Sequence, residues 1–285
     1  MTYETTAARR AAQPATAAAP AARAVTMRGP AALTAHQFRY DLLAFIRNGQ
    51  ARFFTLALPV AFLLIFATVF GRKTVPVAGG LIHTSVYYVP GIIALGIIQA
   101  AVSNLAISVT AQRENGILKR RRATPVSAGV LVTSRALTAV TVSVVMTGLL
   151  AVIGALAYGA HVPAGHAAAL AVTVLVGAAS FGALGFALAT LIRGADSAQP
   201  TIAAITLPLY FISGIFLATT LLPHWLLNVA GVFPVRPFQQ ALLAAYNPYS
   251  SGTGFAGRDL LIMAAWGIAG LLIATRRFRW TPQSR

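Results

Sequence analysis

The chain has 285 residues, of which 57% are hydrophobic and 9% charged, with a formal net charge of +17 and a mean hydropathy of +0.73. Because about a quarter of the residues in soluble proteins are charged, this composition indicates a membrane protein. The lack of cysteine excludes disulfide bonds, zinc–thiolate sites and a thiol nucleophile. The Lys and Arg residues flank apolar segments instead of gathering on one face, so we expect a lipid bilayer and no nucleic acid as a partner.

The N-terminal stretch, residues 1–33, is rich in Ala, Pro and Arg and lacks the apolar core of a signal peptide. We expect a disordered cytoplasmic tail, with translation starting at Met1 or at Met27. Thr34 and Gln37 then have the spacing of a capping box. Apolar residues follow at helical spacing with Arg on other faces, which predicts an amphipathic helix on the inner leaflet; the alternative is an extension of the first span. This helix is defined by Phe38, Arg39, Leu42 and Phe45.

Six uncharged runs are long enough to cross a bilayer as helices, which need about 20 apolar residues each. Lys and Arg gather before the first run, between the second and third, after the fourth and after the sixth, and such residues mark cytoplasmic flanks. The sequence therefore predicts an all-α membrane domain over residues 34–285, with six transmembrane helices and both termini in the cytoplasm. The predicted spans are about 53–70, 86–110, 136–158, 167–192, 199–222 and 260–275.

The segment between the fifth and sixth runs is apolar but is interrupted by Pro234 and Arg236. An Arg at the bilayer centre costs about 2.5–3.5 kcal/mol, and a crossing here would also move the basic cluster 276–279 to the outside. We therefore expect two short helices that re-enter the outer leaflet. Trp225 and Phe233 should pack against the upper part of the fifth span. The residues that define this outer segment are Pro223, Trp225, Phe233 and Pro234.

The spans contain none of the groups that catalysis within a membrane requires, such as a nucleophile with a base, a carboxylate pair or a metal cluster. The five acids lie outside the spans or at their ends. No catalytic site, metal or cofactor is expected in this chain. Its two lysines, Lys73 and Lys119, do not fit the phosphate-binding pattern G-x-x-x-x-G-K-[ST], so any ATP hydrolysis requires another chain.

The cytoplasmic stretch QRENGILKRRRATPVS, residues 112–127, has an acid at its start, a basic run, and a Thr-Pro break. This order predicts a short charged helix that begins near Glu114. The stretch resembles the signature E-x-G-x-L-x-x-x-x-x-T-P of the type-2 ATP-binding-cassette (ABC-2 type) exporter permeases. The outer segment matches the same family at Ser213–Gly214, Leu222–Trp225 and Phe233–Pro234. The residues that carry the cytoplasmic resemblance are Glu114, Gly116, Leu118, Lys119, Arg120, Thr124 and Pro125.

The resemblance implies the permease subunit of an ATP-driven exporter, in the drug, antibiotic or lipid efflux branch. In that family, residues 112–127 would form a coupling helix that docks on a separate ATPase subunit. Two such ATPase copies would bind ATP and Mg, and a second permease copy or a paralogue would complete the pathway. For Arg120–Arg122 the alternative is an anchor on anionic lipid. The Ala- and Arg-rich composition is typical of a high-GC bacterium, so we expect the bacterial cytoplasmic membrane.

Two other classes of function remain as alternatives: an ion-coupled carrier and a membrane scaffold, both acting without an ATPase. Carriers tend to place an ionisable residue at mid-membrane, and none is found within the predicted spans. Polar residues of the second span, such as Gln99 and Ser103, either bond between helices or line a pathway. The residues expected on the substrate path are Asn104, Tyr210, Phe211 and Ser213.

Overall fold

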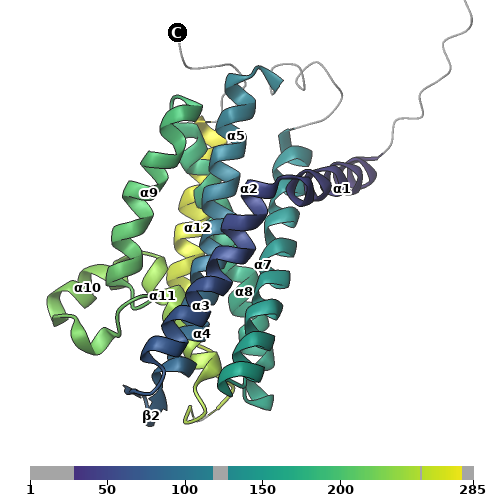
Figure 1. Ribbon diagram of the computed structural model, residues 1–285. Coiled ribbons are helices and arrows are strands. Elements are labelled where there is room, and N and C mark those ends of the chain that lie inside the picture. Colours follow the sequence, from purple (N-terminus) through teal and green to yellow (C-terminus); the bar gives the residue numbers. More distant parts are fainter. Residues whose placement is uncertain (1–28, 118–127, 251, 278–285) are drawn as a thin grey trace, which may run out of the picture.

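The long apolar runs form long helices, because backbone groups in lipid must find hydrogen-bond partners within their own segment. The computed structural model describes residues 29–117, 128–250 and 252–277. Within these residues, five helical stretches are long and apolar enough to cross a membrane, and they run along one bundle (Figure 1). These stretches are Gly49–Phe70, Thr84–Glu114, Gly129–Tyr158, Ala164–Leu191 and Gly257–Arg277. They coincide with five of the predicted spans and mostly extend a few residues further.

Two of the five stretches contain a π-helical turn, which no sequence pattern predicts. The first consists of α2 (Gly49–Arg52), the π turn η1 (Phe53–Ala57) and α3 (Leu58–Phe70). The second consists of α4 (Thr84–Ile98), the π turn η2 (Gln99–Ser103) and α5 (Asn104–Glu114). The others are α7 (Ala128–Tyr158), the short 3-10 turn η3 (Ala164–His166) with α8 (Ala167–Leu191), and α12 (Gly257–Arg277).

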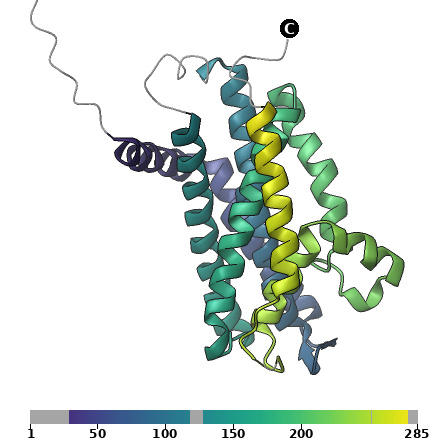
Figure 2. The same cartoon turned by 180° about the vertical axis from the view of Figure 1, so that it is seen from behind.

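The core of the bundle surrounds α4, whose residues are all buried except Val86. Helix α4 packs against α3 and α7, while α8 packs along α12 (Figure 2). The α8–α12 contact depends on small residues: a Cβ atom at Gly270 would lie 2.9 Å from the backbone nitrogen of Leu184. Such close approach of two backbones is typical of helix pairs in membranes.

The fifth predicted span, 199–222, differs most from the structure. The observed helix α9 (Ala195–Ile212) begins four residues earlier and ends ten residues earlier. Gly214 follows with φ +94°, a left-handed conformation that favours glycine and turns the chain out of the helix. The next residues form an irregular segment with the 3-10 turn η4 (Thr219–Leu221). The sequence prediction was wrong here because hydropathy alone does not register this turn.

A β-hairpin between the first two stretches was also not predicted. Strands β1 (Thr74–Val77) and β2 (Gly80–His83) pair antiparallel, with Val75 opposite Ile82. These two side chains are buried and pack with Tyr87 of α4. The hairpin lies at the opposite end of the bundle from α1 (Figure 1).

Helix α1 (Pro30–Arg47) packs against α7 and projects sideways from the bundle near one of its ends, across the direction of the long helices (Figure 1). The expected capping box is wrong, since the helix begins at Pro30, whose fixed φ suits a first helical position. The Thr34 hydroxyl instead donates to the Pro30 carbonyl at 2.9 Å, and the Gln37 amide donates to Asp41 at 2.9 Å. The residues that define the amphipathic face are half-buried (Phe38, Leu42, Phe45) or exposed (Arg39).

The outer segment forms two short helices, as predicted: α10 (His224–Val232) and α11 (Val235–Tyr246), broken at Phe233–Pro234. Both lie near the end of α9 that is remote from α1 (Figure 1). Helix α12 then returns along the bundle and ends on the side where α1 lies. Helix α1 and the last residues of α12 therefore lie at the same end of the molecule.

Candidate functional site

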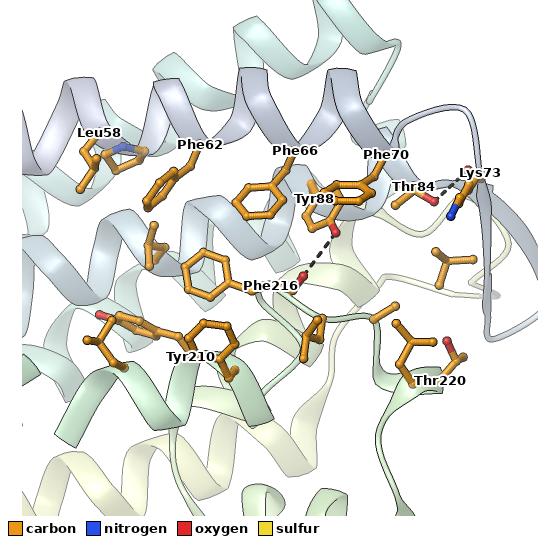
Figure 3. A pocket seen from close by; sticks show the side chains of 18 of the residues that line it. Leu58, Phe62, Phe66, Phe70, Lys73, Thr84, Tyr88, Tyr210, Phe216 and Thr220 are labelled. Atoms are coloured by element: carbon orange, nitrogen blue, oxygen red, sulfur yellow. Dashed lines mark hydrogen bonds between the residues drawn. The ribbon is translucent and has the colours of Figure 1, made fainter. Parts of the chain in front are cut away.

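An aromatic cavity of about 720 Å³ lies between α3, α4, α9 and the segment that follows α9 (Figure 3). Phe62, Phe66 and Phe70 line it from α3, because residues spaced by four share one face of a helix. The Phe66 ring lies 5.2 Å from that of Tyr88 on α4 and 5.6 Å from that of Phe216, between ring centroids. The Tyr88 hydroxyl also donates to the Phe216 carbonyl at 3.3 Å. Aromatic rings from distant parts of the chain thus form one apolar wall.

Two of the expected substrate-path residues, Tyr210 and Phe211, line this aromatic cavity. Ser213 does not: it is buried, and its hydroxyl donates to the Tyr210 carbonyl at 3.3 Å. The phenylalanines of α3 were not among the residues expected on the substrate path. Their regular spacing is a signal in the sequence that could have identified them.

A second cavity of about 630 Å³ lies between α1, α2, α5, α7 and the N-terminal part of α9; we call it the polar cavity because its lining, although mainly apolar, is more polar than that of the aromatic cavity. Its walls are rich in carboxamide side chains. Asn104 is one of them, and its amide donates to the Thr55 hydroxyl of η1 at 2.5 Å. Asn104 therefore bonds to a neighbouring helix and also lines a cavity. The carboxamides of this cavity are Asn48, Gln50, Gln99, Asn104, Gln112, Asn115 and Gln199.

Among the described residues, the charged side chains in the lining of the polar cavity are Asp41 of α1 and Arg135 of α7. They form an ion pair at 3.6 Å, and both side chains are largely buried. The Ser134 hydroxyl also donates to Asp41 at 3.1 Å, and Arg135 donates to the Ser108 hydroxyl at 2.8 Å. Asp41 thus holds α1 against α7, and the two lining charges offset each other.

At the end of α5, two adjacent residues hold the junction between α8 and α9. Arg113 is buried, and its guanidinium donates to the carbonyl groups of Ala189, Ile192 and Arg193 at the end of α8. The Glu114 carboxylate accepts the N–H of Ala195, the first residue of α9, at 2.5 Å. Helix ends leave carbonyls unpaired at one terminus and N–H groups at the other, and these two side chains satisfy both.

Glu114 is the last residue of α5, so it does not itself begin a helix, and most of the predicted short helix lies outside the described residues. The helix of the second span continues through Glu114 because its carboxylate finds its partner on α9. Gly116 has φ +68°, and its N–H donates to the Arg113 carbonyl, so glycine here terminates α5. The remaining coupling residues Leu118, Lys119, Arg120, Thr124 and Pro125 lie outside the described residues.

In the outer segment, Pro223 and Pro234 precede α10 and α11. The Trp225 side chain is 67% exposed. The ring contact of Phe233 is with Trp266 of α12, at 6.2 Å between centroids, and not with α9 as we expected. The Trp266 indole also donates to the Val232 carbonyl at 2.7 Å, so α12 contacts the junction between α10 and α11 through both the ring and the backbone.

Arg236 of α11 is half-buried and donates to the Leu227 carbonyl of α10. Burial lowers the pKa of its guanidinium, and nearby Asp259 and Tyr87 partly offset this shift. The group ties the two short helices of the outer segment together.

Comparison with known families places most of the chain in one of them. The family model of the ABC-2 type transporter matches residues 34–247, from α1 to the end of α11. A search among curated proteins finds no match. Such a domain is the membrane permease component of an ABC transporter, which is not itself catalytic and generally pairs with an ABC ATPase. The chain is a multi-pass membrane protein that belongs to the ABC-2 type transporter family.

Proposed function

We propose that the chain is the permease subunit of an ATP-driven exporter. The observation that carries the proposal is the pair of cavities along the helical stretch Gly49–Phe70. The polar cavity is lined by α1 at one end of the bundle, and the aromatic cavity reaches the β1 strand at the other. Together they offer a route along the bundle that needs no catalytic group.

The membrane topology follows from adding α9 to the five long stretches. At about 1.5 Å per residue, its 18 residues span roughly 27 Å, close to the thickness of the hydrocarbon core. This gives six spans with both termini on the cytoplasmic side, where Arg135 and Arg193 also lie. Helix α1 then rests on the inner leaflet with Tyr40, Leu43 and Ile46 exposed toward lipid. The pair α10 and α11 re-enters the outer leaflet.

Energy comes from a separate ATPase subunit, present in two copies that bind ATP and Mg. Residues 112–127 couple it to the permease, and the Arg113–Glu114 contacts support this, because any displacement at the end of α5 reaches both α8 and α9. A second permease copy or a paralogue covers the open side of the aromatic cavity, whose lining residues Phe70, Phe211 and Leu221 are exposed. The membrane is the bacterial cytoplasmic membrane, and the cargo belongs to the drug, antibiotic or lipid class.

The test is reconstitution of the chain in liposomes with and without the ABC ATPase of a neighbouring gene. Transport of fluorescent amphiphiles should require both chains and hydrolysable ATP. Transport by the permease alone, driven by an ion gradient, would favour an ion-coupled carrier. A stable complex that moves no amphiphile under any condition would favour a membrane scaffold.

A further inference from the structure

The aromatic and polar cavities are adjacent compartments. Phe54 and Gln99 line both of them. Phe54 belongs to the π turn η1 and Gln99 to the π turn η2, and these two turns are in contact. Asn104, directly after η2, bonds to Thr55 within η1. Isolated π turns frequently mark functional sites, and here both lie where the two compartments meet.

The polar compartment suits an uncharged group. Carboxamides offer donors and acceptors together, and the lining charges Asp41 and Arg135 offset each other. A cation or anion would lose its hydration here without meeting a net opposite charge from the described residues of the lining. Within the described part of the chain, the side-chain oxygen of Gln112 is buried and lacks a hydrogen-bond partner. This oxygen is therefore an acceptor that the described residues leave unused, on a side chain that lines the cavity.

The aromatic compartment suits a flat apolar body. Aromatic rings attract other ring systems by stacked and edge-to-face contact, and about 720 Å³ is within the range of small-molecule sites. Among the described residues of its lining, the charged one is Lys73. It lies at the opposite end of the cavity from Leu58 (Figure 3). The boundary with the polar compartment, at Phe54 and Gln99, carries no charge.

We infer that the two compartments together bind one amphiphile, with an uncharged head rich in hydroxyl or amide groups beside Gln99, Asn104 and Gln112 and a flat apolar body against the rings of α3. This assignment rests on the proposed export function and narrows its cargo. It selects neutral glycosylated or amide-bearing aromatic compounds over cationic drugs and anionic lipids.

Four probes with the same body test the assignment: pyrenebutyl β-glucoside, pyrenebutyl trimethylammonium, pyrenebutyrate and butylpyrene. Binding to the full chain in nanodiscs, without an ATPase, is measured by fluorescence anisotropy and corrected with empty nanodiscs. The glucoside should bind at least about tenfold more tightly than the other three, as expected for a few hydrogen bonds in a partly buried site. Equal or tighter binding of either charged probe would overturn the assignment. If butylpyrene bound as tightly as the glucoside, the head group would contribute nothing to binding, and the site would be only a groove for lipid chains.

Variants locate the two halves of the ligand. Gln112→Leu and Gln199→Ala, at two carboxamides that line only the polar cavity, should weaken the glucoside and leave butylpyrene unchanged; Gln199 is exposed, so its variant should fold normally. Gln240→Leu, a half-buried carboxamide of α11 outside both cavities, is the control. Phe54→Ala should weaken every probe, whereas Phe53→Ala, an exposed neighbour outside both linings, should not. Unchanged glucoside selectivity in both Gln variants would overturn the assignment.

The binding experiment tests the site, and the transport experiment tests the proposed function, so the two can fail independently. Selective glucoside binding with no ATP-dependent transport would leave the site in place and reject the exporter. ATP-dependent transport of the cationic probe, without glucoside selectivity, would keep the exporter and reject this site.

Discussion

The contacts of Arg113 and Glu114 predict a graded series of effects at the junction of α8 and α9. In Glu114→Ala the N–H of Ala195 loses its acceptor, which is equivalent to removing a helix cap and costs about 0.5–2 kcal/mol. Glu114→Gln keeps an oxygen acceptor of the same shape and loses only the charge at the positive end of α9, which costs about 0.3–1 kcal/mol. Glu114→Lys removes the acceptor and adds a charge of the unfavourable sign, so it should exceed Glu114→Ala.

Arg113→Leu should be the most destabilising change in this series. It removes the donor from three carbonyl groups, of which those of Ala189 and Ile192 belong to buried residues. Each buried carbonyl left without a partner costs about 1–3 kcal/mol, so this variant threatens folding itself. The Glu114 variants, in contrast, should insert normally and lose the connection between helices.

The assay uses the absence of native cysteine. Spin labels on cysteines introduced at Asn115 and Ser197, two exposed positions at the ends of α5 and α9, report the distance between the helices. The distance distribution should broaden in Glu114→Ala and less in Glu114→Gln. Asp196→Ala is the matched control, since it removes an exposed acid from the same turn of α9. Equal distributions in Glu114→Ala and Asp196→Ala would refute the reasoning.

Four further predictions concern other contacts. Asp41→Ala should release α1 from α7 at a cost of about 1–3 kcal/mol, seen as faster hydrogen exchange in α1; Arg39→Gln, on the exposed side, should not, and equal exchange would contradict this docking. His166→Phe should lower the thermal midpoint, because both ring nitrogens lie within 3.2 Å of the carbonyl oxygens of Ala245 and Gly252; an unchanged midpoint would contradict this. Gly270→Leu should separate α8 from α12 and lower the yield of folded protein, whereas Gly182→Ala, with open space around it, should be tolerated. Single cysteines at Ala35 and Arg277 should label from the cytoplasm and one at His161 from outside; external labelling at 277 would mean an odd number of crossings.

Helix positions could be predicted from the sequence wherever apolar runs end at charges. The stretch Ala164–Leu191 is bounded by a polar loop and by Arg193, and the prediction 167–192 differs by three residues at most. The break at Phe233–Pro234 was likewise visible, because proline cannot continue a helix. The prediction for the fifth span was wrong at its C-terminal end, because the helix stops just before the left-handed backbone of Gly214. Hydropathy averaged over a window of residues does not detect such a turn.

The contacts of the candidate site were less predictable, because they join residues far apart in the chain. Glu114 was recognised as a residue of interest, but its partner Ala195 lies 81 positions away and no local pattern connects them. From its neighbours in the sequence Glu114 was expected near the start of a helix, whereas it is the last residue of α5. The rings of Phe66 and Phe216 meet only after α3 and the segment following α9 are packed. The regular spacing of the phenylalanines on α3 is visible in the sequence. The residues that face them across the cavity are not.

The measurement that tests the central claim most directly is ATP-driven uptake of pyrenebutyl β-glucoside into inside-out vesicles that contain the chain and its ATPase. Two neighbouring variants are compared: Phe54→Ala, which lines both cavities, and Phe53→Ala, which lines neither. If the cavities along the stretch Gly49–Phe70 are the transport route, uptake should fall at least about tenfold in Phe54→Ala at equal membrane level and ATPase content, and remain near the wild-type rate in Phe53→Ala. Equal uptake by both variants would contradict a pathway through these cavities.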